Sequence, residues 1–409
     1  MKIVIIGAGP AGLMCAVKAS ENKDNHVIVL EKNEKVGKKL YITGKGRCNV
    51  CNHTSTQQIL DNIVTNKKFM LSSLNAFNAE DVMDFFKTNG TNLKIERGNR
   101  VFPQSDKASD ITKTFLKVLN KKNVNILLNT NVKAIKFDEN NVFCVVTGST
   151  TIICDAVVVC TGGKSYASTG STGDGYKFAK NLGLNVVDVK PALVPIKLKD
   201  YDGSLAGLSL KNVNVSINIK SKKFEQFGEM LFTHNGISGP IILTLSSYIN
   251  RYDLNDAELS IDLKAALTEE RLDTRLINDF IIFKNKSFKK YLKELLPNSL
   301  IDFFINYINI DANKQVCNIS KTERRKIINT LKGLKFKIDS LDKLDYAIVT
   351  SGGVDIKQIN PKNMESKLIK NLFFVGEVLD VDALTGGFNI QIALSTGFSA
   401  GKYLKEIGG

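Results

Sequence analysis

A glycine-rich turn near the start of the chain constrains its fold more than any other feature. Gly7-Ala8-Gly9-Pro10-Ala11-Gly12 separates an apolar run at residues 2–6, predicted to be a buried strand, from a predicted helix at residues 11–20. In this context the first glycine permits a tight turn, the second admits a pyrophosphate, and the third lets helix and strand pack closely. The helix N-terminus adds partial positive charge. The sequence therefore predicts a dinucleotide site.

An acidic residue stands where such a site needs one. Glu31 lies 19 residues after Gly12 and ends a second predicted strand at residues 26–30. Its carboxylate can accept hydrogen bonds from a ribose 2′-hydroxyl, which favours an adenosine without a 2′-phosphate. A tight turn without a ligand would explain the glycines, but the strand, helix and acidic residue together favour a nucleotide-binding site.

Periodicity changes along the rest of the chain. Asn78 is a predicted N-cap, short strands follow between residues 124 and 159 with a hairpin turn at Asn140 and Asn141, and strands continue beyond residue 190. From about residue 268 to 334 the pattern is helical, with a capping box at Ser320 to Glu323. A strand at 372–375 and a helix at 389–403 then return the chain to its first domain.

These elements predict an α/β fold with two insertions. We expect a Rossmann-like domain from residues 1–189 and 346–409, a β-rich insertion domain at 190–266, and a mainly helical insertion domain at 267–345. Both chain ends would then belong to one nucleotide-binding domain.

Composition bounds the compartment and the partners. The chain has 409 residues, 43% of them hydrophobic, and no apolar run long enough for a membrane span. Its first twenty residues are apolar enough for a signal peptide, but Gly7, Gly9, Pro10 and Gly12 interrupt them and only Lys2 precedes the run, which favours a strand, loop and helix. Seven scattered cysteines fit free thiols in a reducing compartment, so a cytoplasmic protein is expected. The net charge of +15 could attract nucleic acid or phosphorylated ligands, but the lysines form no long run and no RNA-binding motif is present, so nucleic acid is not the expected partner.

Several later segments carry a family resemblance. Besides Gly7 to Gly12, they are 36–40, 43–49 (Thr-Gly-Lys-Gly-Arg-Cys-Asn), 161–165, 171–175, 231–240 (Leu-Phe-Thr-His-Asn-Gly-Ile-Ser-Gly-Pro) and 375–382 (Val-Gly-Glu-Val-Leu-Asp-Val-Asp). With these motifs the chain resembles the BaiN/YhiN-like flavoproteins, also called the aminoacetone-oxidase family, over nearly its whole length. That resemblance implies FAD.

The resemblance also implies which residues hold the cofactor. The first glycine loop would contact the pyrophosphate, Glu31 the ribose and the Val132 backbone the adenine, while 44–49 and 386–390 would approach the pyrophosphate, ribityl chain and isoalloxazine. Backbone amides at the start of the final helix could stabilise negative charge on the flavin. The expected cofactor-binding residues are Gly7, Gly9, Pro10, Ala11, Gly12, Glu31, Lys32, Lys39, Gly44, Gly46, Arg47, Cys48, Asn49, Val132, Thr161, Gly162, Gly163, Gly376, Glu377, Asp380, Gly386, Gly387, Phe388, Asn389 and Ile390.

Few side chains are available for chemistry besides the cofactor. His234, in a polar turn before Gly239 and Pro240, is the candidate proton donor, although a histidine that stabilises the turn is the stronger interpretation. Lys39 and Asp382 are weaker candidates on the substrate side. Cys48 and Cys51 form a C-x-x-C that would permit thiol-disulfide exchange, but an incidental pair is favoured. Three histidines leave little scope for a metal site.

The sequence therefore predicts an FAD-dependent oxidoreductase that acts on a small organic substrate by hydride transfer. NADH or NADPH is expected as a transient reductant, and it would dock without a dedicated domain because a second complete G-x-G-x-x-G is absent. The alternative is that the organic substrate reduces the flavin directly. Two alternatives stay open: an FAD-dependent enzyme that acts on RNA, suggested by the charge, and a flavin-binding sensor or assembly protein without turnover. Substrate, direction of the reaction and oligomeric state stay undetermined.

Overall fold

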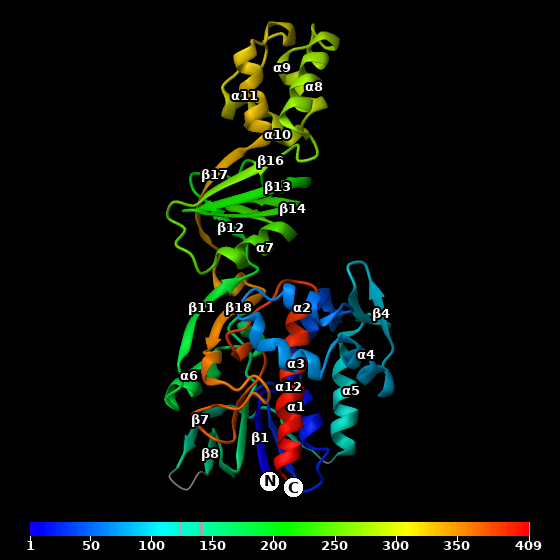
Figure 1. Ribbon diagram of the computed structural model, residues 1–409, viewed down its shortest axis with the longest axis vertical. Helices are drawn as coiled ribbons and strands as arrows, with labels where there is room; N and C mark the ends of the chain where they lie inside the picture. Colours follow the sequence, from blue (N-terminus) through cyan, green and yellow to red (C-terminus); the bar gives the residue numbers. More distant parts are fainter. Residues whose placement is uncertain (123, 139–141, 409) are drawn as a thin grey trace. The chain divides into compact units, whose positions relative to one another are not determined.

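The computed structural model describes residues 1–122, 124–138 and 142–408, and the chain forms two compact units (Figure 1). The first unit combines residues 1–192 with residues 344–409, and the second comprises residues 193–343. The expected turn at Asn140 and Asn141 falls outside the described residues. The subdivision of the insertion at residue 266 stays a prediction.

A parallel sheet forms the centre of the first unit. Its strands follow the order β19-β10-β1-β2-β6. They are β1 (Lys2–Ile6), β2 (His26–Leu30), β6 (Asn125–Leu127), β10 (Ala156–Val159) and β19 (Leu372–Phe374). The residues of β10 and β19 are all buried, as expected for strands covered on both faces. The predicted Rossmann-like sheet is confirmed, and its last strand comes from the carboxyl-terminal part of the chain.

Helices and 3-10 turns surround this sheet. The helices are α1 (Pro10–Ala19), α2 (Thr56–Asp61), α3 (Leu71–Ala76), α4 (Ala79–Thr88), α5 (Ala108–Lys121), α6 (Asp174–Asn181) and α12 (Phe388–Ile407). The 3-10 turns are η1 (Lys38–Gly46), η2 (Lys67–Met70), η3 (Ala167–Thr169), η6 (Leu344–Tyr346), η7 (Ile356–Gln358) and η8 (Gly376–Val378). Asn78 caps α4 through a reciprocal capping box with Asp81, as the sequence predicted.

The first and last long helices cross in contact with each other. A side chain at Gly397 would place its Cβ atom 2.2 Å from the Ala11 carbonyl oxygen, and one at Gly401 would stand 2.5 Å from the Cys15 carbonyl oxygen. Only glycine, which has a hydrogen atom in place of a side chain, permits two helix backbones to approach this closely. The carboxyl end of α12 also contacts the segment after α1, since Lys405 forms an ion pair of 2.9 Å with Glu21, and Figure 1 draws the two chain termini next to each other.

Three small sheets complete the first unit. β3 (Cys51–Asn52), β5 (Arg100–Pro103) and β4 (Leu93–Glu96) form one antiparallel sheet. β7 (Val132–Phe137), β8 (Phe143–Thr147) and β9 (Thr151–Cys154) form a second, and β11 (Val186–Ala192) pairs with β18 (Val349–Val354). The sequence predicted strands in the region of β7, β8 and β9, but it did not predict β3, β4, β5 or β18, nor the pairing of these strands.

The second unit is built on a closed barrel. Its strand order is β12-β15-β14-β13-β16-β17. The strands are β12 (Ile196–Leu198), β13 (Ser209–Ile219), β14 (Lys222–Thr233), β15 (Gly236–Ser238), β16 (Glu258–Asp262) and β17 (Leu334–Leu341), and α7 (Pro240–Ile249) packs against β14. β17 lies in the stretch expected to be mainly helical. Closing the barrel between β16 and β12 requires it, because an open edge would leave backbone groups unpaired.

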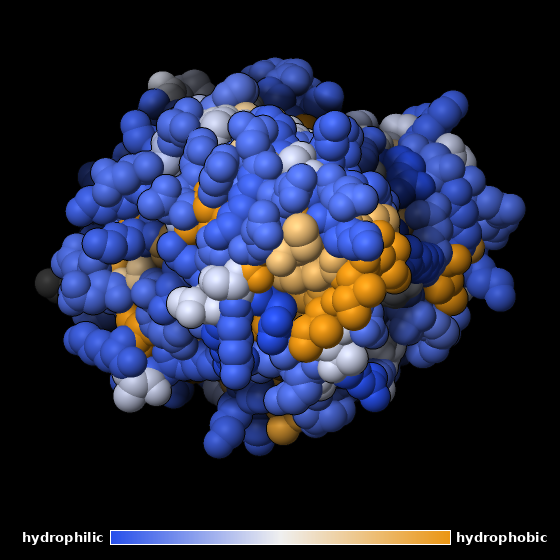
Figure 2. All heavy atoms as spheres, turned by 90° about the horizontal axis from the view of Figure 1, so that it is seen from above, coloured by the Kyte–Doolittle hydropathy of each residue, from blue (hydrophilic) through white to orange (hydrophobic). Residues whose placement is uncertain are grey.

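The remaining elements of this unit are helical. They are α8 (Glu269–Ile282), α9 (Phe288–Tyr291), η4 (Leu292–Glu294), α10 (Asn298–Ile308), η5 (Val316–Asn318) and α11 (Lys321–Lys332). Ser320 forms the predicted capping box with Glu323. Ile281 and Ile282, at the end of α8, are both 69% exposed, and Figure 2 shows a hydrophobic patch within a mostly hydrophilic surface. Among the helices of the described ranges, none is both long enough and apolar enough to cross a membrane.

The crossing of α1 and α12 yields a stability prediction. We expect Gly397→Ala to lower the free energy of unfolding by about 1 to 3 kcal/mol, because the added methyl group must separate two packed backbones. Urea unfolding of the purified protein measures this. Gly148→Ala is the matched control, since a Cβ atom there meets no atom within 4 Å, and its effect should stay within about 0.5 kcal/mol. Equal stability of the two variants would contradict the close crossing.

Candidate functional site

The glycine loop between β1 and α1 provides an open cradle at one position. Gly7 takes a φ of +106° and donates its amide to the Leu30 carbonyl, and a side chain at Gly12 would stand 2.0 Å from the Gly7 carbonyl oxygen. These two glycines are fixed by packing. Gly9 is different, because a Cβ atom there would meet no atom within 4 Å. The open space lies at the N-terminus of α1, where Pro10 and Ala11 begin the helix.

Glu31 lies at the carboxyl end of β2 and is almost buried. One carboxylate oxygen accepts a hydrogen bond of 2.9 Å from the Ala8 amide, and the other accepts from both the backbone and the side chain of Asn33. The carboxylate is thus held beside the glycine loop. This is the position that the spacing to Gly12 predicted.

Two further predicted contacts lie near the ends of these strands. The Lys32 ammonium group has two oxygen partners, Asp174 at 2.7 Å and Thr172 at 2.6 Å, and so links the end of β2 to the start of α6. Val132 is buried at the start of β7, paired with Thr147. The Asp174 carboxylate would therefore compete with a cofactor for the positive charge of Lys32. The sequence did not indicate this ion pair.

The segment from Gly44 to Asn49 forms a folded loop that includes the last residues of η1. Gly44 and Gly46 have φ values of +56° and +88°, and Cys48 takes +65°, so the chain turns repeatedly there. Asn49 is buried, and its Oδ1 atom has no hydrogen-bond partner within the described residues. Arg47 points to another element, since its guanidinium contacts Glu96 at 2.8 Å.

The start of α12 packs against this same loop. Gly387, the N-cap of α12, has a φ of +99°, and a Cβ atom there would stand 2.4 Å from the Cys51 carbonyl oxygen and 3.0 Å from Asn49 Oδ1. The Asn389 side chain bonds both the amide and the carbonyl of Ala383, which fixes the preceding turn. This turn contains Gly386, and the first residues of α12 include Phe388 and Ile390. The structure thus brings the two predicted segments together.

A polar cluster lies at the end of β19. Glu377 accepts hydrogen bonds from Lys39 at 2.7 Å, from the Ser165 hydroxyl at 3.1 Å and from the Thr350 amide at 3.0 Å. Gly376 packs against α1, where its Cβ atom would stand 2.9 Å from that of Ala11. The Lys39 charge is therefore balanced within the protein.

The loop after β10 lies beside this cluster. A side chain at Gly163 would collide with the Thr350 hydroxyl and approach Glu377, and Gly162 has a φ of +74°. Thr161 Oγ1 is buried, and no described residue forms a hydrogen bond with it. All three predicted residues therefore lie at the carboxyl edge of the parallel sheet.

Two buried acidic residues follow η8. Asp380 accepts a hydrogen bond of 3.0 Å from the Asn66 side chain, and Asp382 accepts one of 2.9 Å from the Ser351 hydroxyl. The Asp382 carbonyl also accepts the amide of Val64. These contacts join residues 62–66 to the segment that leads into α12.

The two neighbouring cysteines are buried free thiols. Burial raises the pKa of Cys48 to about 12, although a hydrogen bond with Thr43 opposes that shift. Burial also raises the pKa of Cys51. Because the thiolate is the reactive form, neither side chain is prepared for thiol-disulfide exchange near neutral pH.

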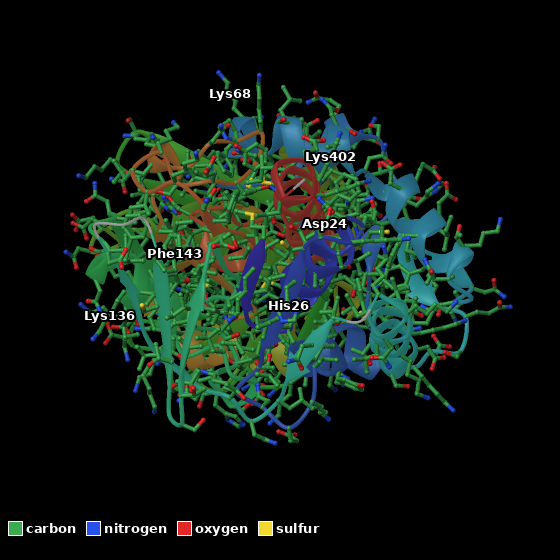
Figure 3. All side chains as sticks on the ribbon, turned by 90° about the horizontal axis from the view of Figure 1, so that it is seen from below. Asp24, His26, Lys68, Lys136, Phe143 and Lys402 are labelled. Atoms are coloured by element: carbon green, nitrogen blue, oxygen red, sulfur yellow. The ribbon has the colours of Figure 1, made fainter. Side chains whose placement is uncertain are left out.

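The histidines lie in separate surroundings. His234 is exposed in the turn between β14 and β15, in the second unit, so its role as proton donor stays a prediction. His26 is exposed at the amino end of β2, the end opposite Glu31 (Figure 3). His53 pairs with Glu80 at 2.6 Å. Across the ranges that the structure describes, histidines, cysteines and carboxylates form no group of three suited to a metal ion.

Sequence reasoning missed two residues that organise the site. The Asn52 side chain donates to the carbonyls of Gly98 and Gly386, each at 3.0 Å. The Thr350 hydroxyl accepts the amides of Lys164 and Ser165. Both partners are far away in the sequence, so no local pattern could identify either residue.

The residues present fit a bound dinucleotide with a flavin. The open space beside Gly9 accommodates a pyrophosphate at the positive end of α1, and Glu31 stands beside it. The buried Asn49 Oδ1, next to Gly387, is an acceptor suited to a ligand donor. Both features suit FAD, and they lie in one compact unit.

Comparisons with known proteins identify the family of the chain. The profile of the HI0933-like protein Rossmann domain matches residues 1–403. The chain is 30% identical to a Haemophilus influenzae protein named ribosomal RNA dihydrouridine synthase, covering 97% of this chain and 96% of that one. It is 27% identical to a Clostridium scindens protein named 3-dehydro-bile acid delta(4,6)-reductase, covering 99% of each.

A solved structure supports the fold. The chain is similar to the Mycobacterium smegmatis Sdh1 complex in the apo form, with a TM-score of 0.51, 15% identity, and coverage of 100% of this chain and 68% of that one. At this identity the likeness concerns the fold alone. Because the family profile spans nearly all of the chain, the protein belongs to the family with the HI0933-like Rossmann domain.

Proposed function

We propose that this protein is a flavin-dependent RNA dihydrouridine synthase, which hydrogenates the C5=C6 bond of uridine in ribosomal RNA. The observation that carries this proposal is the 30% identity, over nearly the full length of both chains, to a relative named for that activity. The sequence by itself favours a small organic substrate and leaves RNA as an alternative. The similarity and the net charge of +15 together favour RNA.

The chemistry is common to both relatives. Dihydrouridine differs from uridine by two hydrogens across a double bond that is conjugated with a carbonyl group. A 3-dehydro-bile acid with double bonds at positions 4 and 6 likewise offers conjugated carbon atoms to a hydride donor. One site geometry can therefore serve either substrate, and the contacts outside the flavin decide which substrate binds.

The charge is the reason to prefer RNA. The chain has 56 lysines and arginines against 41 acidic residues. A polyanionic substrate gains affinity from such an excess through counterion release, whereas a bile acid with one carboxylate gains little. Electrostatic attraction also raises the rate of encounter with a ribosomal RNA.

The residues of the first unit would hold FAD. The Gly9 space and the amides of α1 would receive the pyrophosphate, Glu31 the ribose, and the segments 44–49 and 386–390 the flavin end. Bound FAD supplies two-electron transfer between a nicotinamide and the substrate. The amides at the N-terminus of α12, capped by Gly387, would stabilise negative charge that develops near them.

The electrons balance with a nicotinamide reductant. NADH or NADPH gives up a hydride, uridine gains that hydride and one proton, and the products are NAD⁺ or NADP⁺ and dihydrouridine. The proton comes from a protein side chain or from solvent. His234 is the donor that the sequence predicts, and solvent is the alternative source.

A second candidate is reduction of a small conjugated ketone. The Clostridium scindens relative, which covers 99% of the chain, favours it. Both candidates predict flavin bleaching by NADH or NADPH under anaerobic conditions. If the protein is instead a flavin-binding sensor without turnover, no candidate acceptor should reoxidise the reduced flavin and restore its colour.

The first prediction concerns Gly9. We expect Gly9→Val to weaken FAD binding by about tenfold or more, roughly 1.4 kcal/mol, because the side chain would occupy the space proposed for the pyrophosphate. FAD fluorescence titration of the deflavinated protein measures this. The apoprotein should keep its melting temperature, since the Gly9 backbone is extended and no atom lies within 4 Å of the added Cβ. Gly148→Val, at an equally open surface position, should bind FAD normally. Undiminished binding by Gly9→Val would remove the pyrophosphate from this loop.

The second prediction concerns the substrate. We expect the FAD-loaded protein with NADPH or NADH to form dihydrouridine in ribosomal RNA from cells that lack the gene. Mass spectrometry of nucleosides detects the gain of two hydrogens. A 3-keto bile acid with conjugated double bonds is the parallel substrate. Its reduction, with RNA left unchanged, would replace the first candidate by the second.

The third prediction concerns the thiols. Because burial raises the pKa of Cys48 to about 12, the group stays protonated from pH 7 to 9 in the folded protein, and thiolate forms only at more alkaline pH. Iodoacetamide at pH 8 should modify the exposed Cys317 and spare Cys48 and Cys51 until the protein is unfolded. Cys51→Ala should retain flavin reduction by NADH or NADPH. Loss of turnover together with rapid labelling of Cys48 would support a redox-active pair.

A further inference from the structure

We propose that the hairpin of β4 and β5 binds the RNA phosphates next to the target uridine, through Arg97 and Arg100 at its tip. This inference rests on the proposed function and assigns a substrate-binding element to it. The hairpin lies in the same compact unit as the FAD segments. It therefore requires no assumption about the second unit.

The hairpin tip is bonded to the loop that begins α12. Asn52 donates to the Gly98 carbonyl in the tip and to the Gly386 carbonyl beside the α12 N-terminus, at 3.0 Å each. The two oxygens can be no farther apart than twice that distance. The Asn99 carbonyl also accepts the His53 amide at 2.7 Å. The tip is thus fixed next to the proposed flavin end of the site.

The sheet register orients Arg100 toward this region. Asn52 and Arg100 are direct partners of β3 and β5, so their side chains start from the same face of the sheet. Phe102, two residues farther along, extends from that face as well and lies against Gly44, where a Cβ atom would stand 2.9 Å from its ring. The Arg100 guanidinium bonds the Arg97 carbonyl at 3.0 Å, which holds it across the tip.

The charge at the tip is not balanced by the protein. Arg47 and Lys94, on the same small sheet and its adjoining loop, form ion pairs with Glu96 and Asp106. No described carboxylate forms an ion pair with Arg97 or Arg100, and both arginines are exposed. The guanidinium groups of Arg97 and Arg100 are therefore available to bind phosphates at the tip of the hairpin. The neighbouring cations, Arg47 and Lys94, are already neutralised.

This arrangement suits an RNA strand with one base withdrawn from its stack. An enzyme that acts on a base must bring it out of the helix, and the phosphates on either side then face the rim of the site. Arginine matches a phosphate with a two-pronged hydrogen bond, and it stays charged at any physiological pH. A steroid-like substrate offers no such groups, so this element would separate RNA from a small ketone.

The test uses the FAD-loaded full chain and Arg97→Gln/Arg100→Gln. We expect affinity for a fluorescein-labelled single-stranded oligouridylate, measured by anisotropy, to fall by about tenfold or more, and the dependence of log K on log salt to lose about 1 to 1.5 units of slope. Dihydrouridine formation in ribosomal RNA should fall through a higher KM. FAD content and the rate of flavin reduction by NADPH or NADH should match the wild type.

The matched control removes two charges elsewhere in the same unit. Lys133→Gln/Lys136→Gln changes two exposed lysines of β7, and Lys136 lies at the periphery of the view in Figure 3. This variant should keep its RNA affinity and salt slope within about twofold of wild type. If both variants lose RNA affinity equally, the hairpin contributes only to the general charge of the protein, and the proposal is overturned.

The two proposals fail in different ways. If the wild type makes dihydrouridine and Arg97→Gln/Arg100→Gln does so with unchanged KM and RNA affinity, the hairpin proposal is wrong and the function stands. If the wild type binds the oligouridylate through the two arginines and makes no dihydrouridine, the function is wrong and the hairpin remains an RNA-binding element. A wild type without RNA affinity overturns both.

Discussion

The backbone of α12 lies directly on the backbone of α1, at the points where Gly397 faces Ala11 and Gly401 faces Cys15. Since both contacts advance by four residues, the helices run in the same direction. Phe388, the first residue of α12, stands nine residues before Gly397, roughly 14 Å along the axis at 1.5 Å per residue. The N-terminus of α12 is therefore displaced from the N-terminus of α1 along the direction that the two helices share. An extended dinucleotide, with its pyrophosphate at one terminus and its flavin at the other, is the kind of ligand that such an offset accommodates.

The parallel sheet adds a second constraint. Because β1, β2, β10 and β19 are parallel, the segments that follow them emerge at one edge, and these segments contain the glycine loop, Glu31, Thr161 and Gly376. Substitutions at Gly7 or Gly12 would disturb packing, whereas Gly9 borders open space. In this motif, Gly7 and Gly12 are therefore required by packing, whereas Gly9 leaves space for a ligand. The sequence alone does not distinguish these two roles.

The sequence predicted the elements better than their contacts. The β1, α1 and β2 unit, the N-cap at Asn78 and the capping box at Ser320 are local patterns, and each is present. The pairing of Lys39 with Glu377 joins residues 338 positions apart, and no spacing rule reaches that far. Strand β17 was missed because closure of the barrel depends on strands distant in the chain.

The distribution of charge explains how a general excess can coexist with a specific contact. At physiological ionic strength the screening length is about 8 Å, so most of the +15 excess would act on the proposed RNA substrate as a diffuse attraction without a preferred position. Lys32, Lys39 and Arg47 are each paired with a carboxylate, and their charges serve the fold. Cations that lack such partners and lie within direct reach of a phosphate are suited to set the position of an RNA strand. Within the described part of the first unit, Arg97 and Arg100 combine these properties with a fixed link to the start of α12, which makes the hairpin, rather than total charge, the determinant of where an RNA strand would be held.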